Sequence, residues 1–298
     1  MIFKKLYWSF TIIIIIGCTQ DWDLPKPQFS SNINCIIEVN GKDTSYVQYT
    51  KVRTPGDSLR YDFINDASIA ISSNNMLFNF TPQSYRVTYN YKSEIPLIAD
   101  ARQQLSLIIT DPKYGKISSE EIVPARPILV TSSIADSLLK NISSNAKQPI
   151  YSFSGTLNLN TLNRHYLRLK IFMPNDYTLN HFGQPVEKEY ASNMTIRPID
   201  ENEIKLYNNE FFMVDDPSKI YRFKISGSSR LSKNKLNYIV MKISSVNDAF
   251  FKYAMQVDET RKTGNSPFVE PLHIDTNIKN GYGIFGIQNT VIDTFYIR

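Results

Sequence analysis

Three glycines near the end of the chain have the spacing of a phosphate-binding loop. Gly281, Gly283 and Gly286 fit the pattern G-x-G-x-x-G, which cradles a dinucleotide pyrophosphate when it joins a strand to a helix. A crossover helix, a second strand and an acidic ligand for the ribose, about twenty residues further on, must accompany it. Only twelve residues follow Gly286, and residues 291–297 have the composition of a strand. The sequence therefore excludes a dinucleotide site at this position.

Other side chains that commonly act as ligands, bases or nucleophiles are scattered along the chain. None of the three histidines has a second His or a Cys at zinc-ligand spacing: His165, His181 and His273. Asp215 and Asp216 could bind a cation or form an acid–base pair, but Pro217 follows them and favours a hairpin turn. We find no nucleophile-elbow or P-loop motif. We therefore predict no enzymatic activity, cofactor or metal site, while a site assembled from distant residues, or a hydrolase without a recognised motif, stays open.

The N-terminus has the pattern of a targeting segment. Lys4 and Lys5 precede a largely apolar stretch, residues 6–16, which ends in five consecutive isoleucines. A helix rises about 1.5 Å per residue, so this stretch is too short for a hydrocarbon core of roughly 30 Å. We expect residues 1–17 to be a signal peptide that is removed.

The end of this segment resembles the bacterial lipobox. Ile15, Ile16 and Gly17 precede Cys18, and the resemblance implies that Cys18 receives a diacylglyceryl thioether, that cleavage occurs before it and that its new amino group is acylated (palmitate). Several acyl chains, at about 0.8 kcal/mol per buried methylene, hold a protein on a membrane. An ordinary secretory signal with a chance cysteine is the alternative. With Cys18 lipidated, only Cys35 is left, so an intrachain disulfide is excluded.

Short motifs indicate the compartment. Residues 18–31 are expected to be a flexible tether, because their prolines and polar residues suit an extended segment. Asp21 and Asp23 resemble the surface-export signal of Bacteroidota lipoproteins, which implies an anchor on the outer membrane that faces the cell exterior. The two Asp-Ser-Leu triplets, at residues 57–59 and 136–138, resemble the O-glycosylation signal of the same bacteria.

Composition excludes one class of partner and leaves another open. The net charge is +5, and removal of Lys4 and Lys5 leaves 31 basic against 28 acidic residues, a net charge of +3. Without a concentrated basic stripe, this balance does not predict nucleic-acid binding. Aromatic residues make up 12% of the chain and could line a glycan or peptide groove, although core packing explains most of them better.

Period-two alternation of apolar and polar residues dominates the chain beyond the tether and predicts strands with one buried face. It is clearest at residues 67–72, 86–91, 167–171 and 221–225. Cys35 lies in a similar apolar stretch, which indicates a small buried strand residue and not a catalytic thiol. The other candidate strands are residues 33–39, 46–52, 104–110, 117–123, 151–157, 211–213, 237–244 and 292–297.

Helical spacing is rare. It predicts a short helix over residues 133–142 and a clearer one over residues 247–257. The second helix would begin with Asn247 as its N-cap and place Phe250 and Ala254 on one face.

This pattern predicts a mainly β fold, because strands and helices do not alternate regularly. Two prolines, Pro124 and Pro127, follow a strand and indicate a domain boundary. We expect residues 32–125 to form an N-terminal Ig-like β-sandwich, since about seven candidate strands lie there. Residues 126–298 would form a second β-rich domain with one helix near its C-terminus and a final strand.

The C-terminal segments together resemble a known family. An aromatic-rich helix with Phe250 and Phe251 is followed by a Pro-Phe-Val-Glu-Pro segment at residues 267–271, and then by residues 277–286. This order is similar to that of a Bacteroidota lipoprotein family catalogued as domain of unknown function 4249, and the resemblance covers essentially the whole chain after the signal peptide.

The last part of this pattern is the family motif. We expect it to form a turn that leads into the final strand, with positive φ at Gly281 and Gly283. The side chains of Ile284 and Phe285 would then enter the core. The motif residues are Asn277, Asn280, Gly281, Gly283, Phe285 and Gly286.

The resemblance implies a context and no chemistry. Proteins of this family are envelope lipoproteins, often encoded beside TonB-dependent outer-membrane receptors, and look like surface partners that assist capture or import of a nutrient. We therefore expect a non-enzymatic accessory or ligand-capture partner of a TonB-dependent transporter, with an unknown nutrient ligand. A surface adhesin or structural assembly lipoprotein is the alternative.

Overall fold

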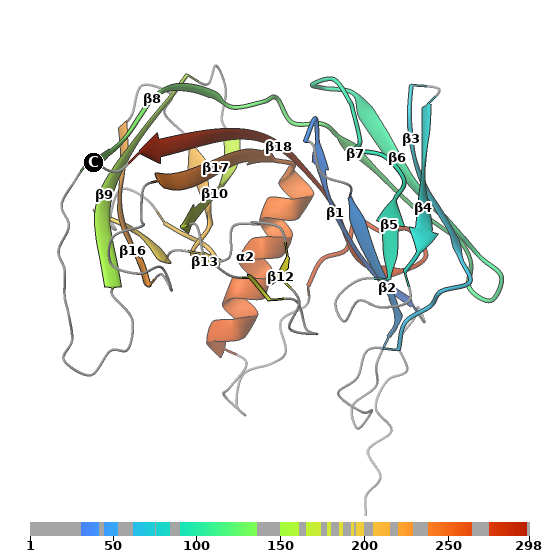
Figure 1. Ribbon diagram of the computed structural model, residues 1–298. Helices are drawn as coiled ribbons and strands as arrows, with labels where there is room; N and C mark the ends of the chain where they lie inside the picture. The colour runs from blue at the N-terminus through green and yellow to red at the C-terminus, as the bar shows by residue number, and fades with distance from the viewer. Residues whose placement is uncertain are drawn as a thin grey trace, which may run out of the picture. The chain divides into compact units, whose positions relative to one another are not determined.

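The fold is mainly β, with one helix near the C-terminus of the described chain (Figure 1). All described residues belong to one compact unit, Phe29–Val52 together with Arg60–Arg298. The computed structural model describes residues 31–41, 45–52, 62–74, 76–83, 90–135, 150–160, 165–173, 178–179, 185–186, 192–193, 195–199, 205–214, 220–228, 238–263 and 274–296.

Twelve strands form one sheet. Its order is β13-β10-β17-β18-β1-β2-β5-β4-β3-β6-β7, and β15 also pairs with β10. In chain order these strands are β1 (Ser31–Val39), β2 (Tyr46–Lys51), β3 (Ser68–Ser73), β4 (Met76–Pro82), β5 (Tyr91–Ser93), β6 (Gln104–Asp111), β7 (Gly115–Ile122), β10 (His165–Met173), β13 (Ser192–Asn193), β15 (Phe211–Val214), β17 (Tyr238–Val246) and β18 (Tyr282–Tyr296).

The other described strands form two smaller sheets. The four-stranded one has the order β14-β16-β9-β8, and its members are β8 (Ile128–Ala135), β9 (Ile150–Asn160), β14 (Thr195–Pro198) and β16 (Ile220–Ser228). The third sheet is the pair β11 (Thr178–Leu179) and β12 (Pro185–Val186).

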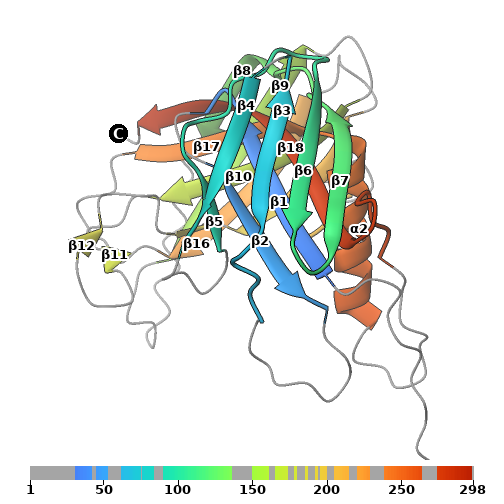
Figure 2. The ribbon, with the colours of Figure 1, turned by 90° about the vertical axis from the view of Figure 1, so that its right-hand side faces the viewer.

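The last described strand joins the two parts of the large sheet. The first half of β18 pairs in parallel with β1, from Asn32 opposite Tyr282 to Val39 opposite Asn289. Its second half pairs antiparallel with β17, up to Tyr238 opposite Tyr296. A single strand therefore connects the N-terminal strands β1–β7 with the C-terminal strands β10 and β17, as Figure 2 shows.

Alternation along the strands produces the two larger of the three hydrophobic cores described. In β1 every second side chain is buried, including Ile33, Cys35 and Ile37, and the first core also receives Phe285 and Ile287 from β18. A second core forms where β10 and β17 pack on β14 and β16. Its largest members are Phe212, Tyr221 and Phe223. Burial of such side chains stabilises the fold by roughly 1.5–3 kcal/mol each.

The helix α2 (Asp248–Thr263) covers part of the large sheet. Phe250, Phe251 and Ala254 are buried on its inner face, and the ring of Phe251 stacks on that of Tyr166 with 4.3 Å between centroids. The acidic first turn and the basic last turn both match the helix dipole.

Glycine allows β18 to approach β1. Gly283 has φ of 112°, and a Cβ atom there would lie 1.8 Å from the carbonyl oxygen of Ile33. A Cβ at Gly286 would lie 2.9 Å from the ring of Phe250, so this glycine admits the helix. Gly281 does not have the expected positive φ. There the constraint is space, because a Cβ would lie 3.1–3.3 Å from three isoleucine side chains.

The structure confirms most of the predicted strands. All of them coincide with observed strands except residues 86–89, which lie outside the described residues. The final strand begins within the motif, at Tyr282, and not after it. The helix predicted over residues 247–257 is confirmed and extends to Thr263. The Ig-like form of the N-terminal strands and the boundary at residue 125 stay predictions.

One predicted helix is wrong in the part that is described. Residues 133–135 belong to β8, which pairs with β9 as far as Ala135 opposite Ser154. The register shifts between Leu129 and Thr131, and such a bulge breaks the period-two pattern that would have revealed the strand. Residues 136–142 lie outside the described part.

We predict that Gly283→Ala strongly destabilises the protein, because the added methyl group would collide with the backbone of β1 and φ is positive. The expected loss in free energy of unfolding, measured by urea denaturation, is more than about 3 kcal/mol. Gly115→Ala is the matched control, since Gly115 also has positive φ (78°) but has no atom within 4 Å of the added Cβ. It should lose only roughly 1 kcal/mol. Equal losses in the two variants would contradict the steric explanation.

Candidate functional site

The family motif is tied to the rest of the fold through Asn277. Its amide nitrogen donates to Glu121 Oε1 at 2.7 Å and to the carbonyl of Phe285 at 2.9 Å, and its oxygen accepts the N–H of Phe285 at 2.9 Å. Ser119 Oγ donates to the Asn277 carbonyl at 2.7 Å. Asn277 thereby fixes the beginning of β18 against β7.

A second amide binds the same carboxylate. Asn247 Nδ2 donates to Glu121 Oε2 at 2.7 Å, and Asn247 Oδ1 accepts the N–H of Ile287 at 2.8 Å. Asn247 stands at the expected N-cap position, since its carbonyl accepts the N–H of Phe251. Its side-chain oxygen, however, binds the backbone of β18 at Ile287 and not the helix. Glu121 thus holds together β7, the start of α2 and the motif.

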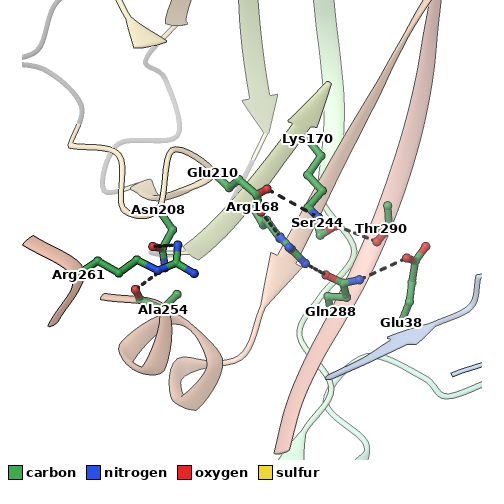
Figure 3. Close-up of polar contacts among 10 residues, drawn as sticks. All are labelled: Glu38, Arg168, Lys170, Asn208, Glu210, Ser244, Ala254, Arg261, Gln288 and Thr290. Carbon is green, nitrogen blue, oxygen red and sulfur yellow. Dashed lines mark hydrogen bonds and ion pairs between the residues drawn. The ribbon is translucent and has the colours of Figure 1, made fainter. Parts of the chain in front are cut away.

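A cluster of charged side chains lies on the large sheet beside α2 (Figure 3). Arg168 of β10 is its centre: Nε donates to Glu210 Oε2 at 2.8 Å, and Nη1 donates to Gln288 Oε1 at 3.2 Å. Gln288 Nε2 in turn donates to Glu38 Oε2 at 3.3 Å. This chain of contacts, the Arg168 cluster, runs from β10 through β18 to β1.

Two cations lie beside the carboxylate of Glu210, and two rings lie beside Arg168. Lys170 Nζ lies 3.7 Å from Glu210 Oε1. Burial lowers the pKa of Lys170, and the neighbouring charge of Arg168 lowers it further, while Glu210 opposes this effect. The guanidinium of Arg168 also lies over two rings, 5.1 Å from the centroid of Phe211 and 5.7 Å from that of Phe250.

The turn before β15 is held to the helix as well. Asn208 Nδ2 donates to the carbonyl of Ala254 at 2.8 Å, and Arg261 Nη1 donates to Asn208 Oδ1 at 3.3 Å (Figure 3). Asn208 itself has φ of 50°, a conformation that asparagine tolerates better than most residues. These contacts present Glu210 to Arg168.

This arrangement suits the positioning of the strands and the helix relative to one another. The carboxylate of Glu121 accepts hydrogen bonds from two asparagine amides. The carboxylate of Glu210 lies beside the two cations Arg168 and Lys170. Charge-assisted hydrogen bonds of this kind are short and directional. Within the described ranges, no group of three or more His, Cys, Asp or Glu side chains could hold a metal ion.

Several residues singled out from the sequence lie outside the described part of the chain: Cys18, Asp21, Asp23, Asp57, Asp136, His181, Asp215, Asp216 and His273. His165 opens β10. Cys35 lies in β1 with no exposed surface, and burial raises the pKa of its thiol far above the ordinary value. Within the described residues, no helix has the length and apolar character of a membrane span.

Sequence reasoning missed Glu121, Arg168 and Glu210. The alternating pattern indicated that Arg168 is an ordinary outward-facing strand residue. Its partners Glu210 and Gln288 are 42 and 120 positions away in the sequence. Nothing in the local pattern could reveal such contacts. Asn247 did give a signal, but it led to a helix cap and not to β18.

The protein is of the mainly β class. Its large sheet pairs β1 with β18, and the glycine-containing motif lies at this pairing. The model of the family described as Domain of unknown function (DUF4249) matches residues 30–292. The chain therefore belongs to this family, as its motif indicated. No curated protein matches the chain.

We predict that Arg168→Met lowers the free energy of unfolding by about 2 kcal/mol, because it leaves the partly buried Glu210 without its hydrogen-bonded cation. Urea denaturation measures the loss. Lys51→Met is the control, because Lys51 forms a comparable pair with Asp62, at 2.5 Å, on an exposed surface and should change the midpoint little. If the two substitutions had the same effect, the Arg168 cluster would not stabilise the fold in the way proposed.

Proposed function

We propose that the protein is a non-enzymatic lipoprotein of the outer membrane, exposed on the cell surface, that assists a TonB-dependent transporter in capturing a nutrient. Acyl chains on Cys18 would anchor it, and residues 18–30 would connect the anchor to β1, because Ser31, assigned to the tether from the sequence, is the first residue of that strand. The unknown ligand would be bound by the β-rich body or at its contact with the transporter.

The observation that carries this proposal is the N-terminal pattern. A short apolar stretch ends in a small residue, and Cys18 follows directly. The stretch is too short to span a membrane, whereas several acyl chains on one cysteine anchor a protein stably. Asp21 and Asp23 support export of the anchored protein to the outer face.

Two observations assign the described polar residues to the fold itself, and a further one supports the choice of partner. The family motif forms contacts inside the large sheet. Gly283 lies against Ile33 of β1, and Asn277 binds Glu121 of β7 and Phe285 of β18. The Arg168 cluster likewise uses its donors and acceptors on residues of the same chain. The resemblance to envelope lipoproteins encoded beside TonB-dependent receptors supports the transporter as partner.

We predict that Cys18→Ser abolishes incorporation of labelled palmitate and releases the protein from the membrane fraction, because the acyl acceptor is lost. Metabolic labelling in the bacterium that produces the protein measures the acylation, and separation of membrane and soluble fractions measures the release. Cys35→Ala is the matched control, because Cys35 is buried in β1 and should leave labelling intact. Undiminished labelling of Cys18→Ser would exclude this residue as the anchor.

We further predict that the tagged, lipidated protein copurifies with an outer-membrane receptor of the TonB-dependent class after mild detergent extraction. Mass spectrometry of the bound fraction identifies the partner, and another outer-membrane lipoprotein with the same tag serves as control. Protease treatment of intact cells should degrade the protein. Recovery of host matrix proteins or glycans without any such receptor would instead support a surface adhesin.

A further inference from the structure

The start of β1, the turn between β6 and β7 and the segment before β18 lie at one end of the large sheet, although they are far apart in the sequence. At this end β1 begins with Ser31, which is paired with Lys51 at the end of β2. The hydroxyl of Tyr49, also near the end of β2, donates to Asp111 Oδ2 at 2.8 Å. The turn between β6 and β7 therefore lies beside the start of β1, toward the lower end of the sheet in Figure 2.

This turn is rigid and carries exposed lysines. Asp111 Oδ1 accepts the backbone N–H groups of Lys113 and Tyr114 at 2.7 and 2.8 Å, and Gly115 completes the turn with positive φ. Lys113 and Lys116 are exposed, and Lys113 Nζ lies 5.2 Å from the centroid of the Tyr114 ring. The turn thus presents two cations and one partly buried ring at a fixed position.

A third lysine comes from the segment before β18. The backbones of Ser118 and Lys279 exchange two hydrogen bonds, of 3.2 and 2.7 Å. Asn280 Nδ2 also donates to the carbonyl of Lys116 at 3.1 Å. Lys279 is exposed, and these contacts keep it next to Lys116.

Four acidic residues are described near these lysines. Asp62 pairs with Lys51 at 2.5 Å, and Asp111 is buried and accepts hydrogen bonds within the turn. Asp66 is exposed beside the turn, because β3 begins opposite the end of β6, and Asp275, exposed in the segment before β18, binds Gln256 of α2. Apart from the Lys51–Asp62 pair, three exposed lysines therefore stand against two exposed acidic residues in the described part of this end.

We infer that Lys113, Lys116 and Lys279 form a membrane-docking surface that binds the phosphate groups of lipid headgroups. This inference rests on the proposed lipid anchor. Residues 18–30 connect Cys18 to β1, and a chain of this length reaches at most about 45 Å. The anchor therefore keeps the end of the sheet that carries these lysines within this distance of the headgroups.

The expected contribution is moderate and depends on salt. Each lysine close to an anionic membrane surface raises the partition constant about fivefold, so three raise it on the order of a hundredfold. The effect falls off within about 10 Å at 0.1 M salt and about 3 Å at 1 M salt. Tyr114 can add an interfacial contact, as tyrosine commonly does at headgroup level.

The test uses the lipidated full-length protein with Pro112→Cys, labelled with an environment-sensitive fluorophore. Pro112 is exposed in the turn, and buried Cys35 should not react. The protein is mixed with phosphatidylcholine vesicles that either contain or lack phosphatidylglycerol. We expect flotation with both vesicles, and a blue shift of the fluorophore that is larger with phosphatidylglycerol and is lost at high salt.

Substitution identifies the residues responsible. The triple variant Lys113→Gln, Lys116→Gln and Lys279→Gln should still float but lose the difference between the two vesicles. The control variant Lys205→Gln, Lys224→Gln and Lys262→Gln removes the same charge from exposed positions elsewhere. It should keep the difference in fluorescence between the two vesicles. Flotation without any effect of phosphatidylglycerol, or an unchanged effect in the first variant, would overturn the docking surface alone. Failure to float with either vesicle would overturn the proposed anchor together with it.

Discussion

The close approach of β18 to β1 is the contact on which the rest of the structure depends. It requires glycine at position 283, because any side chain there would occupy the space of the Ile33 carbonyl oxygen. Once this contact forms, eight successive residues of the two strands pair in parallel register. The same strand then continues along β17. The two hydrophobic cores therefore share one continuous backbone element and not a linker.

Polar side chains fix the directions in which elements leave this joint. Glu121 accepts hydrogen bonds from the side-chain amides of Asn247 and Asn277. The end of β7, the start of α2 and the segment before β18 therefore meet at one carboxylate. The Arg168 cluster acts in the same way between β10 and β1, where Gln288 lies between Arg168 and Glu38. Each contact is modest, but an unpaired partner at such a site would cost more than the contact contributes.

The sequence predicted the elements well and the contacts between them poorly. Alternation identified the strands because each has one buried face, and the spacing of Phe250 and Ala254 identified α2. The motif was recognised as a route into the last strand, but its partner β1 lies some 250 positions away in the sequence. No local pattern encodes such a pairing. The same holds for Arg168, whose neighbours in sequence are typical of any exposed strand face.

The pairing of β1 with β18 has a consequence for folding during synthesis. Ser31–Val39 cannot complete its hydrogen bonds on one side until Tyr282–Tyr296 has emerged. Because the chain is synthesised from its N-terminus, this apolar strand stays without its partner until β18 has been made. Pairings between such distant segments close slowly and expose strand edges to aggregation. Premature termination anywhere before Tyr282 would leave both cores incomplete, because each needs side chains from β18.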